Sequence, residues 1–369
     1  MPSTPAVPLP TSNTMVFYTK RTSVKFALQS SAETTIATTS TSTVPAFDVS
    51  LAPEVSFTER AAHGASLGRL VPMVGQSYAT LSFSTEISCS GVSGQYPKWA
   101  PLLQGCGMTN TTFTESLVGN CAPIDAAPGL SGGTPGSTEQ GCLSFDVHID
   151  GRRYQIQNSM GNFSISGAVG EVPRINWEFQ GKLVSQTAWA TATTYPATNT
   201  YDAVQPCLFL GANTVKLRKY TDTVASAYEA PYVTSYEFDA GNSVGFVSSA
   251  NASDGYAHAV ITERAPTITF DVEMSNAAAD VGNHVNEMMS PATGAEAHYY
   301  ESNLLVKNYD ASDEGNGFNL RAMNGILTGV ELQDRDGIRA ESLSFALAEN
   351  QTANPDSTDS YTISFTDES

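Results

Sequence analysis

Five histidines are the side chains best suited to acid–base or metal chemistry in this sequence: His63, His148, His258, His284 and His298. His284 and Glu287 are spaced i to i+3, which would place both on one face of a helix, where they could hold a metal ion. No third ligand lies near them in the sequence, so we expect a capping or surface pair instead. His148 falls between Val147 and Ile149 in an alternating segment, which predicts a histidine on the solvated face of a strand.

Two short patterns resemble hydrolase and calcium-binding motifs, but their contexts argue against both. Gly-x-Ser-x-Gly occurs at residues 129–133 and 241–245, yet a catalytic serine of this kind needs a sharp turn between a strand and a helix. The first match runs toward Pro135 and the second into a strand-like segment. Residues 334–337, Asp-Arg-Asp-Gly, begin like a calcium loop, but Phe345 occupies the twelfth position, where a glutamate is required. We therefore expect a hairpin turn there.

Other catalytic signatures are missing from the sequence. There is no phosphate-binding glycine loop, dinucleotide fingerprint or zinc-protease motif, and no pair of carboxylates stands out for glycoside hydrolysis. The five cysteines, an odd number without a CxxC pair, favour free buried thiols. The sequence thus predicts a protein that is not an enzyme and binds no cofactor or metal. A β-rich carbohydrate-active enzyme is the least favoured of three functional hypotheses.

Length and composition limit the elements that such a chain can build. Its 369 residues are enough for two domains. Only 15% of the residues are charged, and the abundance of Thr, Ser, Ala and Gly is typical of β-rich folds with many turns. The formal net charge of −19 opposes binding to phosphates, although DNA could pass along such a surface without adhering.

Neither a membrane span nor a secretion signal is expected. No apolar run approaches the roughly 18 residues that a membrane helix needs. The N-terminal segment, through Pro10, lacks the basic start of a signal peptide and is interrupted by prolines. We therefore expect synthesis in the cytoplasm and no membrane partner.

One alternating strand occurs twice and suggests an internal repeat. Residues 80–87 and 267–274 have identical Thr, Phe and Glu residues at three positions, and their numbers differ by an offset of 187 (267 − 80). A period of two separates an apolar face, which includes Leu81 and Phe83, from a polar face. Further segments match in the same order: 24–26 with 215–217, 55–57 with 244–246, and 175–179 with 343–347, at offsets of 191, 189 and 168. These ordered matches favour a tandem duplication over two unrelated β domains.

The repeat predicts a mainly β chain with two tandem domains, each a β-sandwich or partial barrel. Residues 1–14, rich in Pro, Ser and Thr, are expected to form a flexible arm, followed by domains at 15–190 and 191–369. Each domain is expected to have one short helix packed on its sheet, at 96–107 and at 284–289. The residues expected to dock the first helix in the core are Trp99, Leu102, Leu103, Trp177 and Phe179.

Residues 96–107, Tyr-Pro-Lys-Trp-Ala-Pro-Leu-Leu-Gln-Gly-Cys-Gly, resemble a segment of the tail tube proteins (major tail proteins) of long-tailed phages, in which a strand leads into a helix with Trp-Ala and Leu-Leu. Further segments fit the pattern of that family: 66–68, 82–87, 161–167, 173–181 and 261–268. The resemblance covers residues 15–369 and consists of core and turn residues. The second expected helix, at 284–289, departs from it because it lacks the Trp-Ala-Leu-Leu residues.

The resemblance implies a structural virion protein whose subunits form stacked rings, with a channel for DNA ejection through a long non-contractile tail. A duplicated chain would build a pseudo-sixfold ring as a homotrimer; a homohexamer is the alternative. The implied partners are other copies of the chain, a tail terminator, a tape measure protein and a distal tail protein, with DNA only as passing cargo. Assembly in the host cytoplasm and a place in the virion tail are implied as well.

The polar face of the repeated strand is the candidate wall of that channel: Ser82, Ser84, Glu86, Thr269, Asp271 and Glu273. The arm at 1–14 and a Ser/Thr tract at 30–43 are candidates for contacts with the next ring. A Gly-rich loop at 109–141 could either contribute to stacking or decorate the outside of the tube. A β-sandwich binding module, such as a fibre, decoration or adhesin protein, is the second functional hypothesis. Such a module would expose a cluster of aromatic or basic residues, which the sequence does not show.

Overall fold

The computed structural model describes residues 22–29, 43–60, 70–88, 97–108, 119–121, 141–149, 152–188, 209, 215–221, 224–225, 231–273, 284–289, 299–307, 317–348 and 360–366. Within these ranges the strands form one 16-stranded antiparallel sheet and a separate two-stranded hairpin, and there are two short helices. The mainly β fold expected from the sequence is confirmed. The arm at 1–14 and most of the segments at 30–43 and 109–141 lie outside the described residues.

The described part of residues 22–188 holds eight strands. They are β1 (Thr22–Leu28), β2 (Thr43–Val44), β3 (Phe47–Thr58), β4 (Met73–Glu86), β5 (Gly119–Cys121), β6 (Leu143–Ile149), β7 (Arg152–Ala168) and β8 (Arg174–Ala188). The described part of residues 215–366 holds ten more. They are β9 (Val215–Thr221), β10 (Val224–Ala225), β11 (Tyr232–Asp239), β12 (Asn242–Ser248), β13 (Tyr256–Arg264), β14 (Thr267–Glu273), β15 (Tyr299–Lys307), β16 (Gly317–Arg335), β17 (Ile338–Leu347) and β18 (Tyr361–Thr366).

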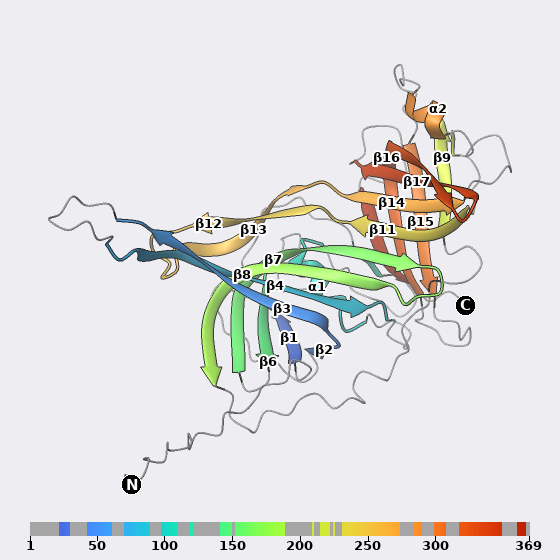
Figure 1. Cartoon of the computed structure of the whole chain (residues 1–369). Helices are drawn as coiled ribbons and strands as arrows, with labels where there is room; N and C mark the ends of the chain where they lie inside the picture. The colour runs from blue at the N-terminus through green and yellow to red at the C-terminus, as the bar shows by residue number, and fades with distance from the viewer. Residues whose placement is uncertain are drawn as a thin grey trace, which may run out of the picture.

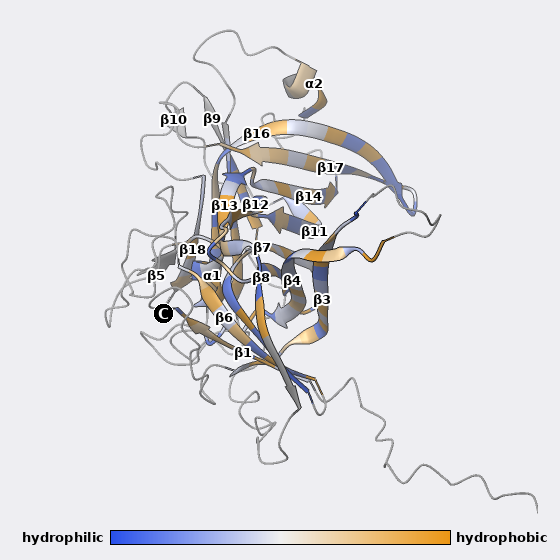
Figure 2. Ribbon diagram, turned by 90° about the vertical axis from the view of Figure 1, so that its left-hand side faces the viewer, coloured by the Kyte–Doolittle hydropathy of each residue, from blue (hydrophilic) through white to orange (hydrophobic). Residues whose placement is uncertain are grey.

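The two halves of the chain pair their strands in the same order. Figure 1 shows strands of the first half, such as β1 and β6, in the lower part of the view and strands of the second half, such as β16, at the upper right. The first half runs β2-β1-β6-β7-β8-β4-β3. The second runs β10-β9-β15-β16-β17-β14-β11, while β12 and β13 form a separate hairpin. Polar and apolar residues alternate along the strands, as the banding of β16 and β17 in Figure 2 shows. This alternation buries one face of the sheet in the core.

The long hairpins β3–β4 and β12–β13 have the same register. Their equivalent residues differ by 187 in number, as Thr80 and Thr267 do. The paired positions are Val55–Ser77 and Phe57–Val74 in β3–β4, and Asn242–Arg264 and Val244–Ile261 in β12–β13. The counterpart of Phe57 is thus Val244, whereas the sequence match of 55–57 with 244–246 made Val244 the counterpart of Val55. That match is therefore two residues out of register.

The sequence match between β8 and β17, residues 175–179 with 343–347, is also two residues out of register. Trp177 lies opposite Phe83, and Leu343 lies opposite Phe270. Because Phe83 and Phe270 are a repeated pair, Leu343 is the counterpart of Trp177, and β8 and β17 are related by an offset of 166 (343 − 177) instead of 168. A shift of two residues preserves the alternation of a strand, so the sequence pattern alone does not detect it.

The two halves are joined by direct pairing of β11 with the second part of β7, where Phe238 lies opposite Ile165. This junction makes a continuous series of eight strands, β3-β4-β8-β7-β11-β14-β17-β16. Both residues at the junction are fully buried. One hydrophobic core therefore runs through both halves.

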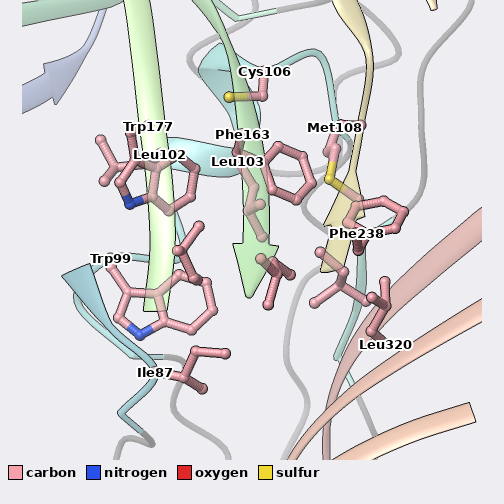
Figure 3. Close-up of a cluster of buried hydrophobic side chains, with 14 of the residues drawn as sticks. Ile87, Trp99, Leu102, Leu103, Cys106, Met108, Phe163, Trp177, Phe238 and Leu320 are labelled. Carbon is pink, nitrogen blue, oxygen red and sulfur yellow. The ribbon is translucent and has the colours of Figure 1, made fainter. Parts of the chain in front are cut away.

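Helix α1 (Leu102–Gly105) docks into this core through the residues around it (Figure 3). Trp99, Leu102, Leu103, Trp177 and Phe179 are all buried. The helix is shorter than the two turns expected at 96–107, because the backbone bonds before and after it span three residues, as in Leu102 N–H to Trp99 O and Cys106 N–H to Leu103 O. Helix α2 (His284–Met289) lies against β16. Neither of these two helices is long and apolar enough to cross a membrane.

The hairpin turn expected at 334–337 is confirmed. Arg335 at the end of β16 lies opposite Ile338 at the start of β17. Asp336 and Gly337 between them have φ values of 52° and 84°, the left-handed values that a two-residue hairpin turn needs. Asp334 accepts a hydrogen bond of 2.8 Å from the Gly337 N–H.

Candidate functional site

The polar faces of the strands at the centre of the sheet line two hollows that share Arg174. The larger has a volume of about 780 Å³ and the smaller about 430 Å³. Five of the six candidate channel residues line them: Glu86, Thr269 and Asp271 in the larger, Ser82 and Ser84 in the smaller. The sixth, Glu273, ends β14 opposite Tyr232 of β11. Ser84 differs from the others because it is buried, whereas the other five are half-buried.

Most of the charged residues on the walls of both hollows are carboxylates. They are Glu86, Glu171, Glu237 and Asp271 around the larger, and Asp48, Glu178 and Asp239 around the smaller. Among the described residues that line the hollows, Arg174 is the single lysine or arginine. Its guanidinium lies 3.5 Å from the Asp48 carboxylate and over the Phe47 ring, 5.0 Å from the ring centroid. The excess of negative charge makes this face repel a phosphate backbone.

Short side chains on this face hold one another by hydrogen bonds between strands. The Ser235 hydroxyl donates to the Asp271 carboxylate over 2.6 Å, and Asn162 Nδ2 donates to the Asp239 carboxylate over 2.8 Å. The second of these bonds crosses the junction between the two halves. These two hydrogen bonds hold the Asp271 and Asp239 carboxylates in fixed positions on the face.

Two strand edges at opposite ends of the eight-strand series have no partner within the described residues. β3 pairs only with β4. β16 pairs only with β17 beyond Ile326. Leu51 on β3 is half-buried and Leu332 on β16 is 54% exposed, whereas their counterparts at the internal junction, Phe238 and Ile165, are both 0% exposed. These two edges thus leave apolar positions uncovered that the internal junction buries.

The correspondence between these residues follows from the register of the sheet. Leu51 is opposite Leu81, and Phe238 is opposite Ile268. Both residues of the second pair are 187 positions after those of the first, so Phe238 is the counterpart of Leu51. Ile165 is opposite Ile175. Leu332 is opposite Glu341. Glu341 is the counterpart of Ile175 at the offset of 166, so Leu332 is the counterpart of Ile165. Sequence reasoning did not identify either edge residue, because an edge is defined by the pairing of distant strands.

Two histidines differ from their expected environments. His148 is buried instead of solvated. It lies opposite Ser23 of the neighbouring strand β1, and its Nε2 is 3.5 Å from the Asp146 carboxylate. Asp146 also accepts two hydrogen bonds of 2.6 Å from Arg153. Burial alone would raise the pKa of the Asp146 carboxyl, but hydrogen bonds from His148 and Arg153 outweigh burial and hold this pKa well below its usual value.

His284 is also buried, and its Nδ1 lies 3.0 Å from Oε2 of Glu341 on β17. This contact anchors α2 to the sheet, so the surface position expected for His284 is wrong. In the part of the chain that the structure describes, no three His, Cys, Asp or Glu side chains gather closely enough to hold a metal ion.

Three cysteines lie within the described residues: Cys106, Cys121 and Cys142. Cys106 and Cys142 are free, buried thiols. Burial raises the pKa of Cys142 to about 11 and raises that of Cys106 well above the usual value. Both thiols are therefore protonated and unreactive at neutral pH.

The site consists of an acidic polar face, two open sheet edges and a core that fixes both. A family model described as "Phage tail tube protein" matches residues 20–287. A search of curated proteins finds no match for the chain. The matched region extends from just before β1 into α2 and includes the internal junction. The chain therefore belongs to the phage tail tube protein family, whose members are structural components of the virion tail.

Proposed function

We propose that the chain is a tail tube subunit that assembles into rings by pairing β3 of one copy with the free edge of β16 in the next. The observation that carries this proposal is the internal junction between β11 and β7. It already joins two halves of the same strand order through counterparts of β3 and β16. Repeating the junction between copies closes every edge of the eight-strand series, which removes the hazard of exposed strand edges.

Three copies form the ring in this proposal. The two halves, residues 15–190 and 191–369, act as two tail-tube-like domains, so three chains supply six similar units. The repeated strand order and the constant offset between the two long hairpins support this division. A homohexamer would instead place twelve such units around the ring.

The acidic polar face lines the channel of the stacked rings, and DNA passes along it during ejection. The carboxylates around the two hollows support this orientation, because a wall that repels phosphates does not retain DNA. In a long non-contractile tail, the ends of the tube contact a tail terminator, a tape measure protein and a distal tail protein. The tube assembles in the host cytoplasm and becomes part of the virion.

Electron microscopy of the purified chain, together with native mass spectrometry, tests this function. The proposal expects rings or stacked tubes, with three chains in each ring. A chain that stays monomeric at high concentration would refute tube formation. Rings of six chains would refute the trimer and leave tube formation standing.

A further inference from the structure

Six large apolar side chains are exposed on the outer part of the β3–β4 hairpin: Val55, Phe57, Leu70, Val71, Met73 and Val74. We call this group the hairpin patch. Phe57 and Val74, which lie opposite each other, are 63% and 70% exposed. The hairpin extends from the body of the chain beside the β12–β13 hairpin (Figure 1). Exposed apolar side chains gathered in this way on a protein surface mark an interaction site, and Phe57 and Val74 share one face of the hairpin.

The counterparts of this pair in the second half are covered. Val244 and Ile261 occupy the same positions of the β12–β13 hairpin. Ile261 is only 9% exposed and packs in a small hydrophobic cluster with Met160 of β7, which is 0% exposed. Val244 packs against the same cluster. The second hairpin is therefore docked on the first half of the chain.

Polar and aromatic contacts fix this docking at several points. The ring of Tyr78 on β4 lies 4.9 Å from that of Phe246 on β12. The backbone N–H of Ser77 donates to the Asp254 carbonyl over 3.3 Å, and the Lys182 ammonium lies 3.1 Å from the Asp254 carboxylate. The hairpin thus packs in one defined position.

The second half carries an uncovered apolar residue where the first half has Met160. Met160 lies opposite Gln180 in β7–β8, and Ile326 lies opposite Ala346 in β16–β17. Both residues of the second pair are 166 positions after those of the first, which makes Ile326 the counterpart of Met160. Ile326 is 42% exposed. Each half therefore has one hairpin and one receiving position, but only the hairpin of the second half and the receiving position of the first half meet within the chain.

We propose that the hairpin patch of one copy packs on Ile326 of the neighbouring copy, with Phe57 and Val74 placed there as Val244 and Ile261 are placed on Met160. The partner is a second copy of this chain, and the inference rests on the proposed ring. It is the same neighbour whose β16 receives β3, because within the chain β11 and the β12–β13 hairpin both contact β7. The contact buries apolar surface at each boundary between copies.

Cysteine cross-linking tests this contact in assembled rings. One chain carries Val74→Cys and another carries Ile326→Cys, and the two are mixed, assembled and oxidised. We expect a disulfide-linked dimer of the two variants on a non-reducing gel. The controls are each variant alone, the unmodified chain under the same oxidation, and Val74→Cys mixed with Val184→Cys, an exposed position on β8.

A second variant measures the energetic effect. Phe57→Ser combined with Val74→Ser should raise the concentration needed for assembly by about tenfold or more, which corresponds to a loss of about 1.4 kcal/mol. Its monomer should unfold at the same denaturant concentration as the unmodified chain, since both side chains are exposed. Rings that form without the cross-link, and at an unchanged concentration in this variant, would overturn the contact and leave the proposed ring intact. An unmodified chain that forms no rings would overturn both.

Discussion

The indole of Trp99 lies against the indole of Trp177, with ring centroids 6.3 Å apart. Trp99 comes from the turn before α1 and Trp177 from the first part of β8, and both are almost fully buried. Trp99 Nε1 donates a hydrogen bond of 3.0 Å to the carbonyl oxygen of Ser88, just after β4. This pair therefore fixes the α1 segment against the sheet that carries the polar face.

Replacing Trp99 should destabilise the chain. We expect Trp99→Ala to lower the free energy of unfolding by about 3–5 kcal/mol, because it leaves a cavity among aromatic rings. Urea unfolding followed by circular dichroism measures the loss. Val169→Ala, at an exposed position after β7, is the matched control and should change stability by less than about 0.5 kcal/mol. A Trp99→Ala chain as stable as this control would show that α1 does not dock as described.

The interaction of the Asp146 carboxylate with Arg153 and His148 predicts a loss of stability in acid. Because the folded-state pKa of Asp146 is depressed, its contribution is complete above the unfolded value near 3.9 and is lost as the pH falls toward the folded value. We expect Asp146→Asn to cost about 1–3 kcal/mol at pH 7. The difference from the unmodified chain should shrink below about pH 4.

Asp336→Asn is the control for this measurement, since Asp336 is exposed in a turn whose left-handed backbone asparagine also tolerates. Unfolding curves at a series of pH values give the comparison. A difference between Asp146→Asn and the unmodified chain that is constant from pH 7 to pH 3 would contradict the assigned role of the carboxylate.

The free edge of β16 predicts a variant that folds but does not assemble. Leu332→Lys places a charge at the position whose counterpart, Ile165, is buried in the internal junction. We expect a monomer with unchanged unfolding and no rings by electron microscopy or analytical ultracentrifugation. Val184→Lys, a similarly exposed valine on β8, should assemble normally. Normal rings from Leu332→Lys would show that this edge is not the site of pairing.

The charge of the polar face predicts how tubes treat DNA. Tubes of the unmodified chain should not retain short duplex DNA. Tubes carrying Ser82→Lys and Glu86→Lys should protect DNA from nuclease at low salt and release it at high salt, because phosphate contacts weaken steeply as counterions accumulate. The control for net charge is Glu263→Lys on β13 together with Ser248→Lys on β12, two exposed positions whose replacement adds the same charge of +3 as the channel variant. Equal protection in the control, or none in the double variant, would argue against this face as the channel wall.

Much of the fold could be predicted from the sequence because its signals are local. Alternation identified the strands at 80–87 and 267–274, and a turn was expected at 334–337. The position of the α1 segment followed from apolar residues at helical spacing. Its length did not, because its backbone bonds are mostly of the shorter three-residue type.

The remaining features depend on which strands become neighbours. The pairing of Phe238 with Ile165 joins segments that are far apart in the sequence, and no local pattern specifies it. His148 was expected on a solvated face, but it is buried in β6 next to the paired strand β1. The matches at 244–246 and 343–347 were two residues out of register because alternation is unchanged by such a shift.

A cryo-electron microscopy map of an assembled ring, reconstructed without imposed symmetry, is the most direct test of the central claim. The account predicts three chains per ring, with β3 of each chain hydrogen-bonded to residues 328–335 of β16 in the next, and with Glu86, Thr269 and Asp271 facing the channel. A ring in which β3 or this part of β16 remains unpaired, or in which these three side chains face outward, would contradict it.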